Sequence, residues 1–274
     1  MKTKVYVVTG ATSGIGKALV EKLAVENVVF AGYRSESKGM ELGRISDNIY
    51  PFYVDYAKPE TIKDAINFVK SKTDKVDTLV NIAGCVVAGP VEKVSINELR
   101  KQFDVNVFGH IEITQGLIEL LNDGKIINIS SMSSFGIFPF ISPYCASKRC
   151  LDMFFNSLLI ENKSNLKIVS IKPGVIATPL WDKSVRENSK LIDKCEGYEE
   201  EMNFIARNAL KNETKGLSVD KVVDLILKID STKNPRLSYL LGKDAVFASL
   251  LSKLPQSLVN KIVKFGLKSR MKSL

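Results

Sequence analysis

The feature that most limits how this chain can fold is a regular alternation of short apolar runs with segments of helical spacing. Runs rich in β-branched residues lie at 5–8, 28–33, 49–54, 78–82, 125–129 and 167–171. The segments between them that show helical spacing are 16–25, 59–71, 96–121 and 144–161. Continuous apolar strands that alternate with helices predict a parallel sheet with helices on both faces. Right-handed crossovers then give a doubly wound α/β sheet, of about seven strands when the run at 236–241 is included.

The length of the chain fits one domain with a short elaboration. We expect a single α/β domain over residues 1–243 of the 274. Residues 176–216 follow a strand end and are polar, charged and irregular. We interpret them as a substrate-covering region with one or two helices, with a surface insertion as the alternative. Residues 244–274 predict a helical C-terminal extension.

This extension is both apolar and basic. Pro255 separates two amphipathic helices, and no acidic residue follows Asp244. Lys261, Lys264 and Lys268 share the second helix with an apolar stripe. Such a helix can lie on an anionic bilayer, close over an apolar pocket or pack at a subunit interface. The sequence leaves these three alternatives open.

Composition argues against several kinds of protein. The four cysteines show no paired spacing and His110 is the sole histidine, so we expect no metal site. The net charge of +9 comes without interleaved basic and aromatic residues, which argues against nucleic-acid binding. The amino terminus enters a strand at once, and no apolar run reaches the ~18 residues that span a bilayer. We therefore expect a cytoplasmic protein, with membrane-surface association as an option.

A glycine-rich turn, Thr-Gly-Ala-Thr-Ser-Gly-Ile-Gly at 9–16, follows the first strand and opens the first helix. Gly10 allows the tight turn, Gly14 lets the backbone approach a pyrophosphate, and Gly16 permits close packing of helix on sheet. The free N–H groups at the start of the helix attract phosphates. This context predicts a single-domain Rossmann fold that binds a dinucleotide. The expected contacts are Gly10, Thr12, Ser13, Gly14, Ile15 and Gly16.

The end of the second strand indicates which dinucleotide is bound. It reads Tyr33-Arg34-Ser35 and lacks the carboxylate that binds the ribose hydroxyls in NAD-preferring sites. Arg34 can pair with a 2′-phosphate, and Ser35 can donate a hydrogen bond to it, so we predict NADP(H). Asp55 ends the third strand, where it can accept from the adenine amino group or cap the following turn.

Two residues suited to proton transfer lie further along the chain. Tyr144 and Lys148 are four residues apart, which places them on one face of a helix. A nearby ammonium lowers the pKa of a phenol and makes it a better acid–base group at neutral pH. This spacing is common by itself, but Ser131 lies thirteen residues before Tyr144, just after the strand at 125–129. Asn106 lies within the long helical segment.

In their order and spacing, these motifs closely resemble the short-chain dehydrogenase/reductase family in its classical form. The resemblance covers about residues 4–180 and includes Asn81-Ile82-Ala83-Gly84 and the run from Pro173 to Thr178. Where the family usually has a double asparagine, this chain has Asn81-Ile82. Three segments are most similar to the hydroxysteroid and retinol dehydrogenase-like branch of the family. They are the motif Tyr-Cys-Ala-Ser-Lys, the cofactor segment Gly-Tyr-Arg-Ser and the C-terminal stretch.

The resemblance implies a role for each matching residue. Tyr144 would be the catalytic acid and base, and Lys148 would hold the nicotinamide ribose and lower the pKa of the tyrosine. Ser131 would orient the substrate oxygen, and Asn106 would support a proton-relay water. Further cofactor contacts are expected from Asn81, Ala83, Gly84, Pro173, Gly174, Val175, Ile176 and Thr178. Trp181 is a candidate substrate contact, with simple packing as the alternative.

The resemblance also implies a function. It predicts an NADP(H)-dependent enzyme that interconverts a secondary alcohol and a ketone on a bulky lipophilic substrate such as a hydroxysteroid. The apolar run at 135–141, after Ser131, suits the wall of such a pocket. The alternatives are a broad-specificity carbonyl, aldehyde or retinal reductase and, outside the enzymes, an NADP(H)-sensing binding protein. A homodimer or homotetramer is expected.

Overall fold

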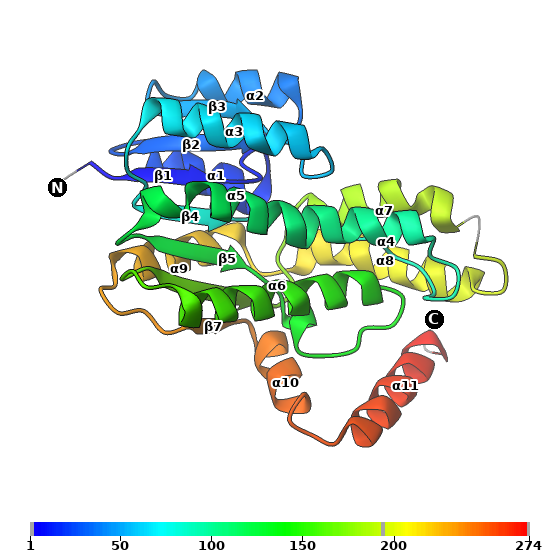
Figure 1. Cartoon of the computed structure of the whole chain (residues 1–274). Coiled ribbons are helices and arrows are strands. Elements are labelled where there is room, and N and C mark those ends of the chain that lie inside the picture. Colours follow the sequence, from blue (N-terminus) through cyan, green and yellow to red (C-terminus); the bar gives the residue numbers. More distant parts are fainter. Residues whose placement is uncertain (1–2, 193–194, 273–274) are drawn as a thin grey trace.

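The computed structural model describes residues 3–192 and 195–272. Within these residues, seven strands form one parallel sheet in the order β3-β2-β1-β4-β5-β6-β7 (Figure 1). Strands β2 and β3 are added on one side of β1, and β4 to β7 are added on its other side. Open α/β sheets place their ligand crevice where the strand order changes side in this way, here between β1 and β4. The predicted doubly wound sheet is therefore confirmed. The strands are β1 (Val5–Val8), β2 (Val28–Tyr33), β3 (Ile49–Tyr53), β4 (Thr78–Asn81), β5 (Lys125–Ile129), β6 (Lys167–Pro173) and β7 (Ser238–Leu241).

Helices cover both faces of the sheet and bury separate apolar layers against it. On one face, α1 (Gly14–Leu23), α2 (Glu36–Gly43) and α9 (Val219–Ser231) contribute to a core cluster that contains Val8. On the other face, α3 (Pro59–Lys72), α5 (Gly109–Leu117) and α6 (Ser142–Glu161) contribute to a second cluster that contains Val7. Neighbouring side chains of β1 thus enter opposite layers, because successive residues of a strand point to opposite faces.

The helical pattern at 96–121 is broken into several elements. It comprises α4 (Ile96–Phe103), a π-helical turn at Asp104–Phe108, α5 and a 3-10 turn at Ile118–Leu121. The helices α2 and α9 were not expected from the sequence. A clear signal was present for α9, because Val222, Val223, Ile226 and Ile229 are buried at helical spacing.

The region at 176–216 contains the two helices α7 (Leu180–Ile192) and α8 (Glu199–Lys215), which pack on each other. The C-terminal extension consists of α10 (Lys243–Leu251) and α11 (Gln256–Lys272), as the amphipathic pattern predicted. In Figure 1 these two helices project from the α/β body, and α11 lies furthest from the sheet. Within the described part of the chain, no helix combines the length and apolar character needed to span a bilayer.

Candidate active site

A cavity of about 1310 Å³ lies at the carboxyl edge of the sheet. Its lining starts at the glycine-rich turn, continues past the ends of β2, β4, β5 and β6, and reaches α7, α8, α10 and α11. Nearly all of the predicted site residues line this one cavity; Gly16, Asn81 and Asn106 do not. The fold thus brings together motifs that are more than one hundred residues apart in the sequence.

The glycine-rich turn packs so closely on the rest of the protein that two of its positions have no space for a side chain. Gly10 has φ +66° and a Cβ there would lie 2.9 Å from the backbone nitrogen of Ala83. A Cβ on Gly16 would lie 2.2 Å from the carbonyl oxygen of Gly10, so this glycine lets α1 pack closely on the turn, whereas the sequence predicted close packing on the sheet. Ser13 precedes α1 and its side chain makes no capping hydrogen bond. The first N–H groups of the helix are therefore not capped by this serine, and the turn fits a dinucleotide pyrophosphate.

The end of β2 lies beside α7 at the same cavity. Arg34 and Ser35 line the cavity and are exposed. The guanidinium of Arg34 is 3.6 Å from a carboxylate oxygen of Glu187 on α7, and Lys183 is 3.9 Å from the same oxygen. Lys38 on α2 also lines this part of the cavity. The cationic groups suit a 2′-phosphate, whereas the negative charge of Glu187 would repel it and competes for the same cations.

Sequence reasoning missed Glu187, the partner of Arg34, and Lys183, which pairs with the same carboxylate. Lys183 and Glu187 show the i, i+4 spacing of a helical ion pair, so their pairing was readable from the sequence. Their position opposite the end of β2 was not readable. That position depends on the packing of α7, which Asn188 fixes to the loop after β4. The Asn188 amide nitrogen donates to the Val86 carbonyl at 2.7 Å, and its side-chain oxygen accepts from the Ala88 N–H at 2.9 Å.

Two of the predicted cofactor residues make structural hydrogen bonds. The Asp55 carboxylate lines the cavity and accepts from the Ala57 N–H at 3.1 Å, so one oxygen caps the following turn. The Asn81 amide is buried and donates to the Asn128 side chain at 2.8 Å, which links β4 to β5. Asn81 therefore links two strands and does not line the cavity, whereas Ala83 and Gly84 do. Contacts of these three residues with the cofactor stay predictions. A contact from Asp55 to adenine stays a prediction.

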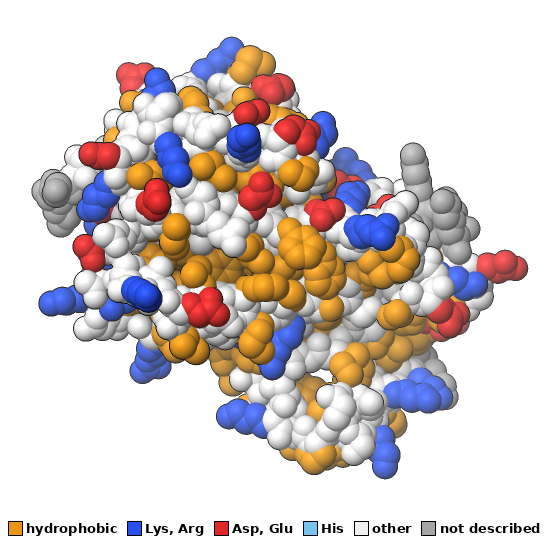
Figure 2. All heavy atoms as spheres, in the orientation of Figure 1, with side chains coloured by type: hydrophobic (Ala, Val, Ile, Leu, Met, Phe, Trp, Pro, Cys, Tyr) orange, Lys and Arg blue, Asp and Glu red, His pale blue; other side chains and the backbone are white. Residues whose placement is uncertain are grey.

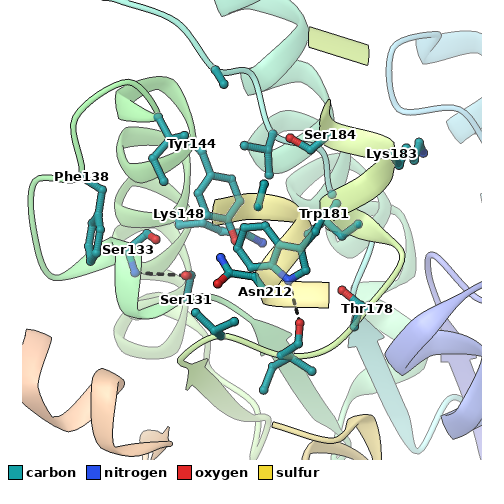
Figure 3. Close-up of a pocket in the computed structure, with 18 of the residues that line it drawn as sticks. Ser131, Ser133, Phe138, Tyr144, Lys148, Thr178, Trp181, Lys183, Ser184 and Asn212 are labelled. Carbon is teal, nitrogen blue, oxygen red and sulfur yellow. Dashed lines mark hydrogen bonds between the residues drawn. The ribbon is translucent and has the colours of Figure 1, made fainter. Parts of the chain in front are cut away.

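The three proposed catalytic side chains converge on one wall of the cavity (Figure 3). Tyr144 and Lys148 come from the first turns of α6, and Ser131 precedes the 3-10 turn at Met132–Ser134 that follows β5. The Ser131 hydroxyl accepts from the Ser133 N–H at 3.0 Å. The Lys148 ammonium donates to the Ile129 carbonyl at 2.8 Å and lies 5.9 Å from the centre of the Tyr144 ring.

Burial controls the protonation of this group of residues. It raises the pKa of Tyr144 to about 12, while a hydrogen bond from Ser131 acts in the opposite direction. Burial also lowers the pKa of Lys148 to about 8, against the attraction of the Asp152 carboxylate. Removal of the phenolate from water is the largest cause of the raised pKa of Tyr144, and Lys148 is not among its causes. A lowering of this pKa by Lys148 stays a prediction.

Asn106 lies in the π-helical turn and holds the loop after β4. Its side-chain oxygen accepts from the Cys85 N–H at 2.9 Å, and its amide nitrogen donates to the Cys85 carbonyl at 3.1 Å and to the Ser147 hydroxyl at 3.1 Å. Such π-helical turns are frequent at functional sites. Asn106 thereby ties the loop that carries Gly84 to the helix that carries Tyr144 and Lys148. Its role toward a relay water stays a prediction.

His110, one helical turn after Asn106, supports the same loop. Its Nε2 lies 2.8 Å from the Ala83 carbonyl and donates to it, because a carbonyl oxygen can only accept. Burial and the nearby charge of Lys148 lower the pKa of this imidazole to about 3. A neutral, fixed histidine therefore holds the backbone that lines the cofactor side of the cavity.

The clamp after β6 and Trp181 complete the site. Pro173, Gly174, Val175, Ile176 and Thr178 line the cavity, and Asp244 fixes this segment by accepting from the Val175 N–H at 2.7 Å. The Trp181 indole donates to the Ile176 carbonyl at 2.7 Å, and Figure 3 shows its ring on the side of the pocket opposite the loop that carries Phe138. Trp181 therefore has a structural bond and a cavity-facing ring at the same time.

A Rossmann sheet with a glycine-rich turn and a serine, a tyrosine and a lysine at one cleft defines an oxidoreductase site for a nicotinamide dinucleotide. The family model for short chain dehydrogenases matches residues 4–189. This chain belongs to the short-chain dehydrogenase family.

Relatives and solved structures extend the match over most of the chain. The NADPH-dependent 3-dehydrocapnine reductase of Ornithobacterium rhinotracheale is 30% identical, over 96% of this chain and 96% of the relative. Estradiol 17-beta-dehydrogenase 2 of Mus musculus is 32% identical, over 96% of this chain and 74% of the relative. The crystal structure of a short-chain dehydrogenase from Streptomyces avermitilis has a TM-score of 0.77 and 26% identity, and the match covers 98% of each chain.

Proposed function

We propose that this protein is an NADP(H)-dependent oxidoreductase that interconverts a secondary alcohol and a ketone on a bulky lipophilic substrate. The observation that carries the proposal is the placement of Ser131, Tyr144 and Lys148 on the wall of a cavity that also contains the glycine-rich turn. A protein that only senses NADP(H) would have no use for a proton-donating phenol beside the cofactor cleft. We therefore favour an enzyme over a protein that only binds and senses NADP(H).

The residues act in the reductive direction as follows. When bound, the nicotinamide supplies the hydride. Ser131 donates a hydrogen bond to the substrate carbonyl oxygen and stabilises the charge that develops there. Tyr144, with its pKa raised to about 12, is protonated at neutral pH and gives its proton to that oxygen. Lys148, held by the Ile129 carbonyl, keeps a positive charge below pH ~8 and orients the ribose side of the cofactor.

The preference for NADP(H) rests on Arg34 and Ser35 at the end of β2, where no carboxylate is present to repel a 2′-phosphate. The relative from Ornithobacterium is named as NADPH-dependent, which supports this choice. Gly84 and most of the segment 173–178 line the same cavity as Tyr144 and Lys148, and a Cβ on Gly84 would lie 3.9 Å from the Lys148 ammonium. This supports the proposal that the nicotinamide binds between them.

The lipophilic substrate is supported by the lining of the cavity. Beyond Tyr144 the cavity is bounded by apolar side chains from the loop after β5 and from α8, among them Ile137, Phe138, Phe204 and Ile205. A hydroxysteroid is our candidate, and the relative from mouse is named for estradiol. We propose that residues 1–243 form the catalytic domain and that residues 176–216 cover the substrate. A broad-specificity carbonyl, aldehyde or retinal reductase is the alternative.

One assay tests the activity. Purified protein is mixed with NADPH and a panel of ketosteroids, retinal and simple ketones, and the absorbance of NADPH is followed. We expect turnover that is lost in Tyr144→Phe, which keeps the ring and removes only the hydroxyl. The same panel with NADH is the control for the cofactor. Tight NADPH binding without turnover of any carbonyl would favour the sensor, and faster turnover with NADH would contradict the role of Arg34.

We also propose that the protein forms a homo-oligomer. Ile96, Phe108, Met153 and Phe154 are between 48% and 60% exposed on α4, the π-helical turn and α6. Figure 2 shows hydrophobic side chains gathered across the middle of the same face of the molecule. Apolar patches of this kind mark protein contacts. Light scattering of the wild type and of Phe154→Asp tests this: the mass of the wild type should be two or four times that of the variant.

Contact with a membrane surface is a separate proposal for α11. Phe265 is 75% exposed and lies among Lys261, Lys264 and Lys268, and Figure 2 shows basic side chains around the lobe that these C-terminal helices form. An apolar side chain among lysines is typical of helices that lie on anionic bilayers. Sedimentation with vesicles that contain anionic lipid should fall in Phe265→Asp. Equal sedimentation of the two proteins would remove this proposal.

A further inference from the structure

The C-terminal helix α11 has two chemically different faces. One face, made of Val259, Ile262, Val263, Gly266 and Leu267, lines the same cavity as the catalytic residues. These positions follow one another at the three- and four-residue spacing of a single helix face. Phe265 and the lysines at 261, 264 and 268 do not line the cavity. The cavity-facing stripe is therefore apolar from Val259 to Leu267, and Arg270, one helical step further on, also lines the cavity. The three lysines lie elsewhere on the helix.

The facing wall of this part of the cavity is also apolar. It includes Phe247, Ala248 and Leu251 of α10, which follow each other at helical spacing. Phe247 is 64% exposed and Ile262 is 39% exposed although both line the cavity, so much of their apolar surface still contacts water. A ligand that covered these side chains would gain free energy in proportion to the apolar area removed from water. The lining thus matches a ligand that is apolar at this end.

The extent of the cavity indicates the shape of that ligand. A typical small-molecule pocket measures about 300–1,000 Å³, whereas this cavity measures about 1310 Å³ and runs from the glycine-rich turn to α11. A bound dinucleotide would take the end at the glycine-rich turn, and the reacting carbonyl would lie at Tyr144. The part between α10 and α11 lies beyond both, so only a substrate with an extended apolar portion reaches it.

We propose that the space between α10 and α11 is a subsite for an unbranched hydrocarbon chain attached to the carbonyl that Tyr144 and Ser131 bind. This inference rests on the proposed function, keeps its bulky lipophilic ketone, and favours a ketone that carries a long alkyl chain over the hydroxysteroid. The chain lies against the stripe of α11 from Val259 to Leu267 and against Phe247 of α10. The reacting carbon stays at the catalytic wall, and the far end of the chain points toward the C-terminal helices.

Binding of alkyl ketones tests this subsite without relying on catalysis. Trp181 is the sole tryptophan of the chain and lines the cavity, so its fluorescence reports on ligands bound there. The probes are unbranched 2-ketones of increasing chain length, titrated below their solubility limits in the presence of NADP+. We expect the affinity to rise by up to about fourfold per methylene group until the chain leaves the subsite, which corresponds to ~0.8 kcal/mol per group.

Matched substitutions on the two faces of α11 locate the subsite. Ile262→Asp places a charge on the cavity-facing stripe and should abolish the gain with chain length, while Phe265→Asp should keep it. Thermal unfolding of both variants controls for stability. If Ile262→Asp does not fold, Leu267→Ala replaces it and should reduce the gain at the longest chain lengths. The same affinity for all chain lengths in the wild type, or an equal loss in both aspartate variants, overturns the proposal.

Turnover in the same series separates this inference from the proposed function. Reduction of short ketones by NADPH without any effect of chain length on binding would leave the oxidoreductase in place and remove the subsite. Binding that rises with chain length and depends on Ile262, with no NADPH oxidation, would keep the subsite and remove the proposed reaction. Vesicle binding that depends on Phe265 but not on Ile262 would assign the outer face of α11 to a membrane independently of the chain subsite.

Discussion

The buried imidazole of His110 gives a prediction that can be worked out from the structure. Its pKa is lowered to about 3, from ~6.5 in an unfolded chain, because burial and the charge of Lys148 both disfavour the cation. The folded state therefore holds this histidine neutral. The stability that this contributes is fully present above pH ~6.5 and is lost as the pH falls from there toward 3.

The magnitude follows from the two pKa values. Proton linkage gives a loss of about 2 kcal/mol of unfolding free energy between pH 7 and pH 5 from this one group. That is a large fraction of the ~5–15 kcal/mol that stabilises a typical folded domain. His110 holds the Ala83 carbonyl at the cofactor side of the cavity. Because the folded state keeps the imidazole neutral down to pH ~3, we expect this group to leave the NADP(H) affinity of the folded protein unchanged between pH 7 and pH 5.

Substitution by glutamine isolates the effect. His110→Gln removes the titrating group and can still donate to the Ala83 carbonyl. Urea unfolding of both proteins is measured at pH 7 and pH 5. The contribution of the carboxylates to the pH dependence is the same in both proteins, so it cancels in the difference between them. The wild type should lose about 2 kcal/mol more than the variant between the two pH values. An equal loss in the two proteins, or an imidazole proton resonance that titrates near pH ~6.5 in the folded wild type, would refute the argument.

Three further substitutions test other parts of the site and the sheet. Glu187→Gln removes the carboxylate that pairs with Arg34 at 3.6 Å, and should tighten NADPH binding by up to about fivefold, the value of an exposed ion pair, while NADH binding is unchanged in fluorescence titrations. Gly16→Ala places a Cβ 2.2 Å from the Gly10 carbonyl oxygen, so we expect a loss of about 1–3 kcal/mol in urea unfolding and at least tenfold weaker NADPH binding. Asp230→Asn disrupts a buried carboxylate that accepts hydrogen bonds from three side chains at 2.5 to 2.8 Å at the edge of the sheet away from the cavity. It should cost about 3 kcal/mol of stability with unchanged NADPH affinity, and a change in affinity instead would contradict the separation of the two edges.

Short-range patterns in the sequence were sufficient for the sheet and for much of the site. The apolar runs predicted all seven strands with shifts of at most two residues at their ends, because a buried parallel strand needs a continuous run of β-branched and apolar residues. The glycine-rich turn and the Tyr144–Lys148 pair were readable for a similar reason. Each depends on backbone geometry within a few residues, namely a tight turn that requires glycine and a helix that aligns positions four apart.

The tertiary structure decided what surrounds those motifs. The pKa of Tyr144 is raised rather than lowered because the fold removes the phenol from water, and no local pattern encodes that burial. Asn81 is buried against Asn128 of β5 and does not line the cavity, a pairing that depends on the neighbouring strand. The charge of Glu187 reaches Arg34 only through the packing of α7, and the apolar stripe of α11 meets the cavity only through the path of the chain after β7. Contacts between segments far apart in the chain are set by packing of the whole molecule. The sequence therefore determined the glycine-rich cradle and the proposed catalytic residues, and the tertiary structure decided their electrostatics and the shape of the cavity.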